Sequence, residues 1–386
     1  MIPEAEPLAP SSSAEVSLSR IARYASIAFC GVLPVLTVAV LFAGANQDHS
    51  VAMDFGQFYR GAEAILAGDN PYPAGDASLI ASARPYVYPP FPAILLLPLT
   101  MLPLRVAELL VMASLLGVVV AILWLLDVRD WRCYGIAFLW PPVISAIQTS
   151  NPTLWFALAA AVVWRYRDRL VPASAGVGVT LAVKFVLWPL VVWLAATRRL
   201  AAAGLACLLA AGVLFVSWAA IGFTGMVEYP GLLRRLEDTV GDDAYTIRMV
   251  ALDLGAPPPI ARTLWLAIGT GLLAAVVLVA RAGGERRAFI LSLAASLALS
   301  PLVWLHYFAL LLVVVALAQP ALGLVWFVPL LMFGSPGSGN PTLFETTTAL
   351  FAAAVTVALA LTSVPRAPSA TSVGRVGLPP APVEST

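Results

Sequence analysis

Four polar side chains stand out in this sequence because they occur inside or beside long apolar runs: Asp54, Asn151, Lys184 and His306. An aspartate at the water interface is ionised at neutral pH and can accept a proton from a hydroxyl group. A buried lysine must face a cavity or a partner, and a histidine can donate or accept a hydrogen bond. These residue types therefore suit either proton-transfer chemistry at the membrane surface or membrane transport.

The apolar runs themselves predict a membrane protein. Hydrophobic residues make up 60% of the 386-residue chain and charged residues only 11%, whereas soluble domains carry roughly 25% charged residues. A bilayer core of ~30 Å needs about 20 apolar residues per helix, and long apolar runs recur between Ile21 and Thr362. The net charge of +1 excludes a nucleic-acid footprint, and the three scattered cysteines predict neither a disulfide framework nor a metal site.

We expect an all-α polytopic fold of about twelve transmembrane or re-entrant helices. These helices should form a single domain, 19–363, between disordered cytoplasmic tails at 1–18 and 364–386. The pair 134–149 and 152–164 is short enough to be a re-entrant hairpin or two tilted helices. The other expected segments are 21–43, 88–103, 105–126, 173–196, 200–221, 263–281, 287–303, 305–318, 321–333 and 345–363.

Basic residues beside these segments predict the orientation. If every segment crosses the membrane, one face collects Arg20, Arg23, Arg198, Arg199, Arg281, Arg286 and Arg287. The positive-inside rule makes that face cytoplasmic, so the loops 44–87 and 222–262 lie outside and both tails lie inside. The same count conflicts with the rule at one point, because it also puts outside Arg129, Arg132, Arg165, Arg167 and Arg169.

The first external loop begins with the pattern of a short helix. Asp54 is a candidate N-cap, apolar residues follow it at helical spacing, and Gly68 with Pro71 signals the end. We expect this juxtamembrane helix to lie along the outer membrane surface with its apolar face toward the lipid. Asp54 then caps the helix, acts as a base, or does both.

Each remaining polar residue has a structural and a functional interpretation. Lys184 lies about eleven residues into its segment, roughly 16 Å deep at 1.5 Å per residue, where a charge must face a cavity or a partner unless it snorkels. Gln148 and Asn151 either join helices through hydrogen bonds or line a binding groove. His306 should reach the same external face as Asp54, as a structural residue or as a contact to a substrate.

Several sequence elements, taken in order, resemble those of glycosyltransferase family 87. Asp54 follows the first segment, and a Gly-Asp-Asn-Pro-Tyr stretch ends the helix after it. Tyr86 and Tyr88 precede two prolines, in a stretch that also suits a membrane-interface anchor. The later elements are Gln148 with Asn151, Lys184 with a displaced Pro189, and Ser300-Pro301-Leu302-Val303-Trp304-Leu305-His306.

This resemblance implies a GT-C type enzyme of the cell membrane. Such an enzyme transfers a sugar from a polyprenyl-phosphate donor to a glycolipid or lipoglycan on the outer face of the membrane. Mannose is the favoured sugar, and arabinofuranose is the alternative. Such a transfer needs a base, which Asp54 fits in agreement with the resemblance, and His306 is the second candidate catalytic residue. If one carboxylate acts as base and attack is in line, the anomeric carbon should invert, by analogy with inverting glycosidases. Candidate substrate-binding residues are Gln57, Arg60, Tyr86, Tyr88, Gln148, Asn151, Lys184 and Trp304.

Further expectations concern cofactors and competing functions. No cofactor is expected, and we predict no metal because no Asp-x-Asp element occurs near Asp54. The charged residues of 222–262 are expected to form a solvated loop. A transporter of a lipid or small solute would instead need Lys184 and dispense with Asp54, and a noncatalytic scaffold subunit would need neither residue for a transfer reaction.

Overall fold

A computed structural model describes residues 13–45, 52–72, 86–335 and 341–363 of the chain, and every regular element in these ranges is helical. The first half contains α1 (Ser13–Ile27), the π-helical turn η1 (Ala28–Val32), α2 (Leu33–Ala45), α3 (Met53–Ala67), α5 (Pro90–Leu95), the 3-10 helix η2 (Leu97–Met101), α6 (Leu104–Leu125), α7 (Trp131–Phe138), α8 (Pro141–Thr149), α9 (Thr153–Arg165), α10 (Leu170–Val183) and α11 (Pro189–Ala196). The second half contains α12 (Leu200–Ala220), α13 (Tyr229–Val240), η3 (Gly241–Asp243), α14 (Ile247–Asp253), α15 (Pro258–Arg281), α16 (Glu285–Leu299), η4 (Leu305–Leu310), α17 (Leu311–Ala318), η5 (Leu324–Trp326), η6 (Val328–Gly334) and α18 (Leu343–Thr362).

Five helices in the described ranges are long and apolar enough to cross a membrane: Arg20–Gly44, Leu104–Leu125, Leu200–Ala220, Pro258–Arg281 and Leu343–Thr362. The predicted all-helical membrane fold is therefore confirmed, while the predicted number of about twelve spans is not. Shorter apolar helices complete the bundle, among them α9, α10 and α17.

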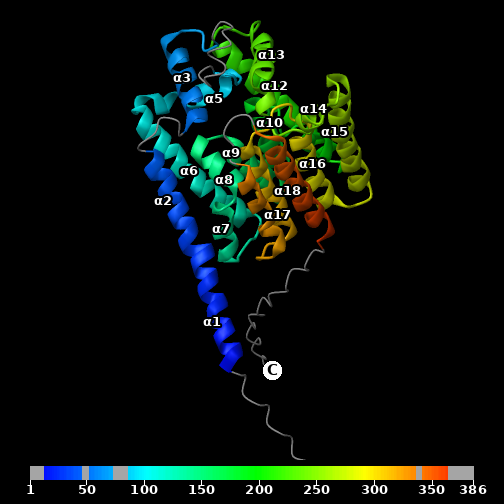
Figure 1. Ribbon diagram of the computed structural model, residues 1–386. Helices are drawn as coiled ribbons and strands as arrows, with labels where there is room; N and C mark the ends of the chain where they lie inside the picture. Colours follow the sequence, from blue (N-terminus) through cyan, green and yellow to red (C-terminus); the bar gives the residue numbers. More distant parts are fainter. Residues whose placement is uncertain (1–12, 46–51, 73–85, 336–340, 364–386) are drawn as a thin grey trace, which may run out of the picture.

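The first helix is longer than expected at its N-terminal end. Helix α1 begins at Ser13, within the predicted tail 1–18, and continues through η1 into α2. The remaining predicted tail residues, 1–12 and 364–386, lie outside the described residues, as do 46–51 and 73–85 of the predicted loop 44–87. Figure 1 shows this first helix rising along one side of the bundle toward α3.

The predicted segment 88–103 does not cross the molecule. Prolines divide it into α5 and η2, which are only 6 and 5 residues long and pack beside α3. Proline removes a backbone donor and is favoured in the first turn of a helix, so closely spaced prolines produce several short helices instead of one long one. Helix α6 then leads from α3 to the opposite end of the bundle.

The arginines that conflicted with the predicted orientation lie at the end of the bundle opposite to α3. Arg165 and Arg129 pair with Asp127 at 3.1 and 2.9 Å, just beyond the C-terminus of α6. Arg167 and Arg199 pair with Glu285 at 3.3 and 2.6 Å. We call this region the arginine end and define it by Arg129, Arg132, Arg165, Arg167, Arg199 and Arg286. Because 88–103 does not cross, the conflict with the positive-inside rule disappears.

Helices α10 and α11 form a hairpin in place of the predicted single span 173–196. Asp168, which precedes α10, accepts a hydrogen bond from Arg199, which follows α11, at 2.6 Å. Both ends of the segment therefore lie at the arginine end, and its tip is the non-helical stretch 184–188. Pro189 at the start of α11 suits a new helix but not the interior of a continuous one.

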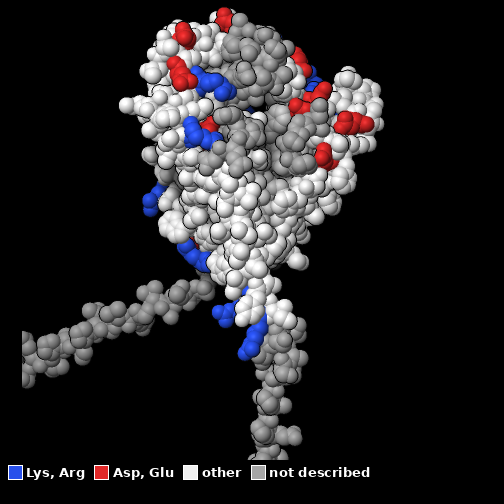
Figure 2. Space-filling view, turned by 60° about the vertical axis from the view of Figure 1, so that its left-hand side comes forward, with Lys and Arg blue, Asp and Glu red and all other residues white. Residues whose placement is uncertain are grey.

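The second half of the chain completes the bundle with helices that run between the same two ends. Arg286 donates hydrogen bonds to the carbonyl oxygens of Leu317 and Ser363, at 3.1 and 2.5 Å, and so joins the C-terminal ends of α17 and α18 to the arginine end. Figure 1 shows α3, α5 and α13 together at the other end. On the face drawn in Figure 2, an uncharged band separates an upper end with acidic and basic side chains from a lower end where the charged side chains are basic.

Candidate functional site

Helix α3 positions Asp54, although not by the predicted cap. The helix begins at Met53, after Ala52 in a left-handed conformation (φ 62°), and no side chain caps it. The Ala52 amide donates a hydrogen bond of 2.7 Å to the carbonyl oxygen of Gln148, which ties the start of α3 to the end of α8. Asp54 therefore lies in the first turn with its carboxyl group available for other partners, and the predicted N-cap role is wrong. The predicted stop is confirmed, because Gly68 ends the helix at φ 78°.

The apolar face of α3 packs against protein. The prediction that this face lies against the lipid is therefore corrected. Phe55, Phe58 and Ala62 are buried, and the Phe58 ring lies 4.5 Å from the Tyr88 ring, centroid to centroid. The Tyr59 hydroxyl donates a hydrogen bond of 2.7 Å to the carbonyl oxygen of Leu102, the residue that follows η2. The helix is thus held on both sides, which gives Asp54 a defined position.

Asn151 binds the carboxylate of Asp54. Its amide nitrogen Nδ2 donates a hydrogen bond of 2.8 Å to Oδ2 of Asp54. Its Oδ1 atom accepts hydrogen bonds from the Thr153 amide at 2.9 Å and from the Thr153 hydroxyl at 2.6 Å. Because Oδ1 is occupied by two donors, the amide group has one favoured orientation, with Nδ2 facing the carboxylate.

The surroundings of Asp54 act on its acidity in opposite directions. Burial raises the pKa of the Asp54 carboxyl above its ordinary value, while the Asn151 hydrogen bond and the Lys184 charge lower it. Burial dominates, so the carboxylate is a stronger base than an exposed aspartate. This direction suits a group that must accept a proton near neutral pH.

Lys184 lies at the tip of the α10–α11 hairpin, where the helix is broken. Its ammonium group donates a hydrogen bond to the Tyr307 hydroxyl. It also lies 5.1 Å from the centre of the Tyr88 ring and 4.9 Å from that of Tyr307, within the range of cation–π contacts. The prediction of a mid-span lysine is corrected to a lysine that the hairpin carries toward Asp54, whose ionisation it affects.

His306 lies in η4, next to the partner of Lys184. Its side chain is buried and its ring stacks on that of Tyr307, with centroids 5.1 Å apart. Its Nε2 atom has no hydrogen-bond partner within the described part of the chain. A buried ring nitrogen without a partner is costly, which favours a role toward a ligand. His306 therefore belongs to the Lys184 side of the site.

The tyrosines of the Tyr-Pro-Pro stretch have separate surroundings. The Tyr86 hydroxyl donates to the carbonyl oxygen of Pro89 at 2.5 Å and accepts from the Ala93 amide at 3.2 Å, so it stabilises the start of α5. A Cβ atom at Gly61 would lie 2.8 Å from the Tyr86 ring, which shows how closely α3 approaches it. Tyr88 instead presents its ring to Lys184.

The other predicted substrate-binding residues make no contact described above with Asp54, Asn151 or Lys184. Gln57 is buried, and its Oε1 atom has no partner among the described residues. Arg60 and the Gln148 side chain are exposed, and Trp304 is half-buried. None of these placements tests a role in substrate binding, which stays a prediction.

Sequence reasoning missed two residues of the site, Tyr307 and Thr153. Tyr307 directly follows the motif that ends in His306, and Thr153 follows Asn151-Pro152. An asparagine two residues before a helix start is a typical local partner for a backbone amide, so the contact between Asn151 and Thr153 could have been predicted from the sequence. The bond from Lys184 to Tyr307 spans 123 positions and had none.

The described residues contain no group of three or more His, Cys, Asp or Glu side chains that could hold a metal ion. Metal independence remains a prediction. The site combines a partly buried carboxylate, an amide donor, an ammonium group and a histidine. These groups can accept a proton from a hydroxyl and stabilise a nearby anion.

Comparison with known proteins agrees with this chemistry. The sequence profile of glycosyltransferase family 87 matches residues 86–304, more than half of the chain. The matched range contains Tyr88, Asn151 and Lys184, and it ends two residues before His306. Neither the curated proteins nor the solved structures gave a match.

Proposed function

Because this chain belongs to glycosyltransferase family 87, and is therefore a membrane glycosyltransferase, we propose that it uses a polyprenyl-phosphate sugar as donor and a glycolipid or lipoglycan as acceptor. Mannose is the favoured sugar and arabinofuranose the alternative, as the commoner activities of the family suggest. The observation that carries the proposal is the arrangement of Asp54 with Asn151 on one side and Lys184 with Tyr307 on the other.

Asp54 is the general base of this proposed reaction. The acceptor hydroxyl oxygen forms a bond to the anomeric carbon while the bond from that carbon to the phosphate oxygen breaks, and the hydroxyl proton passes to Asp54. The phosphate leaves with the bonding electron pair. A single displacement of this kind inverts the anomeric carbon, by analogy with inverting glycosidases. Asn151 holds the carboxylate through its hydrogen bond of 2.8 Å.

Lys184, Tyr307 and His306 stabilise the leaving phosphate. The ammonium group of Lys184 supplies positive charge, and Tyr307 holds that group at the hairpin tip. His306, buried and with Nε2 unpartnered among described atoms, is placed to donate or accept a hydrogen bond to the donor. Charge stabilisation in a site from which water is largely excluded is often the largest contribution to catalysis.

The α3 end is the outer face in this proposal. The arginine end carries most of the basic residues that flank the helices and would face the cytoplasm. Asp54 would then meet a lipid-linked donor and an acceptor outside the cell membrane.

The experiment is transfer by the purified protein in detergent, with radiolabelled polyprenyl-phosphate mannose and arabinose tested separately against candidate glycolipids. Asp54→Asn should keep its thermal stability and donor binding but lose about 10²–10⁴-fold in turnover, the usual contribution of a general base. Glu63→Gln is the matched control, because Glu63 is exposed on the same helix.

Full transfer activity in Asp54→Asn would overturn the assignment of the base. Movement of a lipid across the membrane that depends on Lys184 and not on Asp54, without any transfer, would favour the transporter instead.

A further inference from the structure

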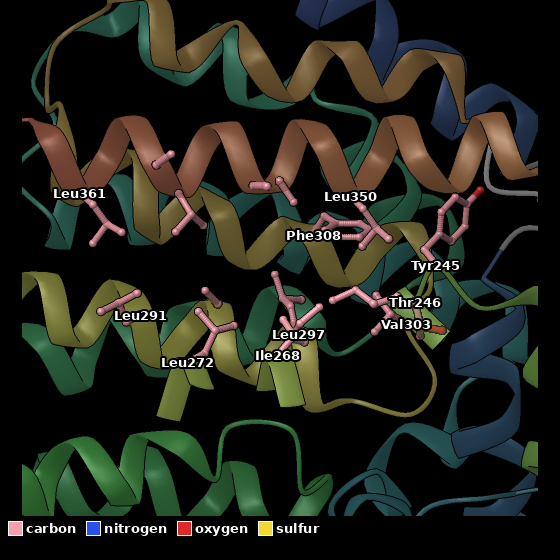
Figure 3. Close-up of a pocket in the computed structure, with 17 residues that line it drawn as sticks. Tyr245, Thr246, Ile268, Leu272, Leu291, Leu297, Val303, Phe308, Leu350 and Leu361 are labelled. Carbon is pink, nitrogen blue, oxygen red and sulfur yellow. The ribbon is translucent and has the colours of Figure 1, made fainter. Parts of the chain in front are cut away.

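An apolar cavity of about 360 Å³ lies between helices of the second half of the chain. Its size is within the range of ligand pockets. In Figure 3, side chains of α18 and side chains of the helices below it point toward one another across the cavity. Leu291 and Leu361 lie at one end, and Tyr245, Thr246 and Val303 lie at the other.

The cavity extends along α18, and we call it the groove. On α18 it is lined from Leu350 to Leu361, a distance of about 16 Å at 1.5 Å per residue. Ile268 of α15, which lines it, is exposed, and so is Leu359 of α18, which lies between the lining residues Ala358 and Leu361 in sequence. Its lining is almost wholly aliphatic and aromatic, so a hydrocarbon chain suits it and a polar molecule does not.

One end of this groove adjoins the candidate site. Val303 and Phe308 line the groove, whereas His306 and Tyr307, between them in sequence, contact each other beside Lys184. The Tyr245 amide donates a hydrogen bond of 2.7 Å to the Val303 carbonyl oxygen, and the Tyr245 ring meets the Phe308 ring at 6.4 Å. The segment 303–308 therefore forms the boundary between groove and site.

We propose that this groove holds the hydrocarbon chain of the polyprenyl-phosphate donor, an inference that rests on the proposed function. The groove is lined by Phe308, which directly follows the Tyr307 that binds Lys184, where the phosphate would lie, whereas Asp54 and Asn151 do not line it. A lipid chain is attached to the donor at its phosphate. The phosphate beside Tyr307 and the chain beyond Phe308 are therefore parts of one molecule.

Two small residues of α18 can be replaced by larger ones to test the inference without overpacking the core. Ala354 and Ala358 line it and are exposed, and Ala358 is four residues farther from the site. Ala358→Trp should block a long chain at depth, while a donor analogue with a short chain still binds. Leu359→Trp is the matched control, because Leu359 is exposed on the same helix but does not line the groove.

The measurements are KM and kcat for the long-chain and short-chain donors, and binding of radiolabelled polyprenyl phosphate to each variant. Ala358→Trp should raise the long-chain KM and the dissociation constant at least about tenfold, the usual effect of a steric misfit in an apolar pocket. The short-chain KM, kcat and all values for Leu359→Trp should stay unchanged. Ala354→Trp, nearer the site, should weaken both donors.

Equal binding of polyprenyl phosphate by Ala358→Trp and wild type would overturn the inference. Native mass spectrometry gives a second test, with polyprenyl phosphate present at saturating concentration. If wild type then still retains an ordinary phospholipid and Ala358→Trp does not, the groove holds that phospholipid, and the inference is overturned as well. If wild type binds polyprenyl phosphate in a manner sensitive to Ala358→Trp but transfers no sugar from any donor, the groove stands and the proposed function fails.

Discussion

At the scale of single residues, the carboxyl group of Asp54 is the centre of the site. Burial and hydrogen bonding act on it in opposite directions, with burial stronger, and its amide partner comes from a turn 97 positions away. Asn151 is oriented by Thr153, so the pair is supported by a second layer of contacts. The proposed role of Asp54 as a base needs such support, whereas an aspartate that merely caps a helix does not.

Asn151→Ala should shift the pH dependence of transfer. If Asp54 is the proposed base, it must be deprotonated to act, so activity falls as the pH drops through the pKa of Asp54. Asn151 lowers that pKa by bonding the charged form, and its loss raises it. The acidic limb of a profile of kcat/KM against pH should therefore move to higher pH.

The control for this prediction is Asp69→Asn, which removes an exposed carboxyl just beyond α3 and should leave the profile in place. An acidic limb in Asn151→Ala that stays in place, or that moves to lower pH, would show that Asn151 does not hold the ionised form of the base.

At the scale of the elements, close backbone contacts decide where broken helices fit together. A Cβ atom built at Gly135 in α7 would lie 1.7 Å from the carbonyl oxygen of Cys30 in η1, so the two backbones touch. The π-helical turn at this contact interrupts the regular pattern of the first long helix. In contrast, a Cβ atom built at Gly117 in α6 would have no heavy atom of a neighbouring segment within 4 Å.

Gly135→Ala and Gly117→Ala should therefore change stability in opposite directions. The first forces two backbones apart and should lower the free energy of unfolding by about 1–3 kcal/mol or more. The second removes a flexible residue from a helix interior and should raise it by roughly 0.5–1 kcal/mol. Thermal unfolding in detergent compares the pair directly, and equal midpoints for the two variants would contradict the α7–η1 contact.

At the scale of the whole molecule, the two ends of the bundle carry different residues: ion-paired arginines at one end and the candidate site at the other. Ion pairs gather Arg165, Arg167 and Arg199 at one end, together with Glu285 at the start of α16. Helix α3 and the turn that carries Asn151 lie at the other. A hairpin, α10–α11, links the two ends, since its base is held by Asp168 and Arg199 while its tip carries Lys184.

Cysteine labelling in intact cells tests this arrangement. In a variant without native cysteines, Asp69→Cys at the α3 end should react with an impermeant maleimide from outside. Ala282→Cys and Arg129→Cys at the arginine end should react only after permeabilisation. All three positions are exposed, so reactivity reports sidedness. Labelling of Arg129→Cys together with Asp69→Cys from outside would mean that 88–103 crosses the membrane after all.

Much of the site was predictable where local chemistry determines it. The helix after Asp54, its end at Gly68 and the polar turn at Asn151 follow from residue types and short spacings, and the resemblance to glycosyltransferase family 87 is confirmed. The cap at Asp54 was wrong because Ala52 takes a left-handed conformation held by Gln148, a contact between distant segments. Apolarity alone also does not separate a span from a hairpin or a row of short helices.

The sequence by itself determined that the chain is a helical membrane glycosyltransferase with an acidic residue soon after its first helix, because composition, apolar length and short motifs are local properties. Only the tertiary structure decided that Lys184 lies at a hairpin tip bonded to Tyr307, that Asn151 contacts Asp54, and that Phe308, next to Tyr307, lines an apolar groove. Such contacts join residues about a hundred positions apart. They depend on how helices of nearly uniform apolarity pack, and periodicity leaves that packing open because such helices have no polar face to orient them.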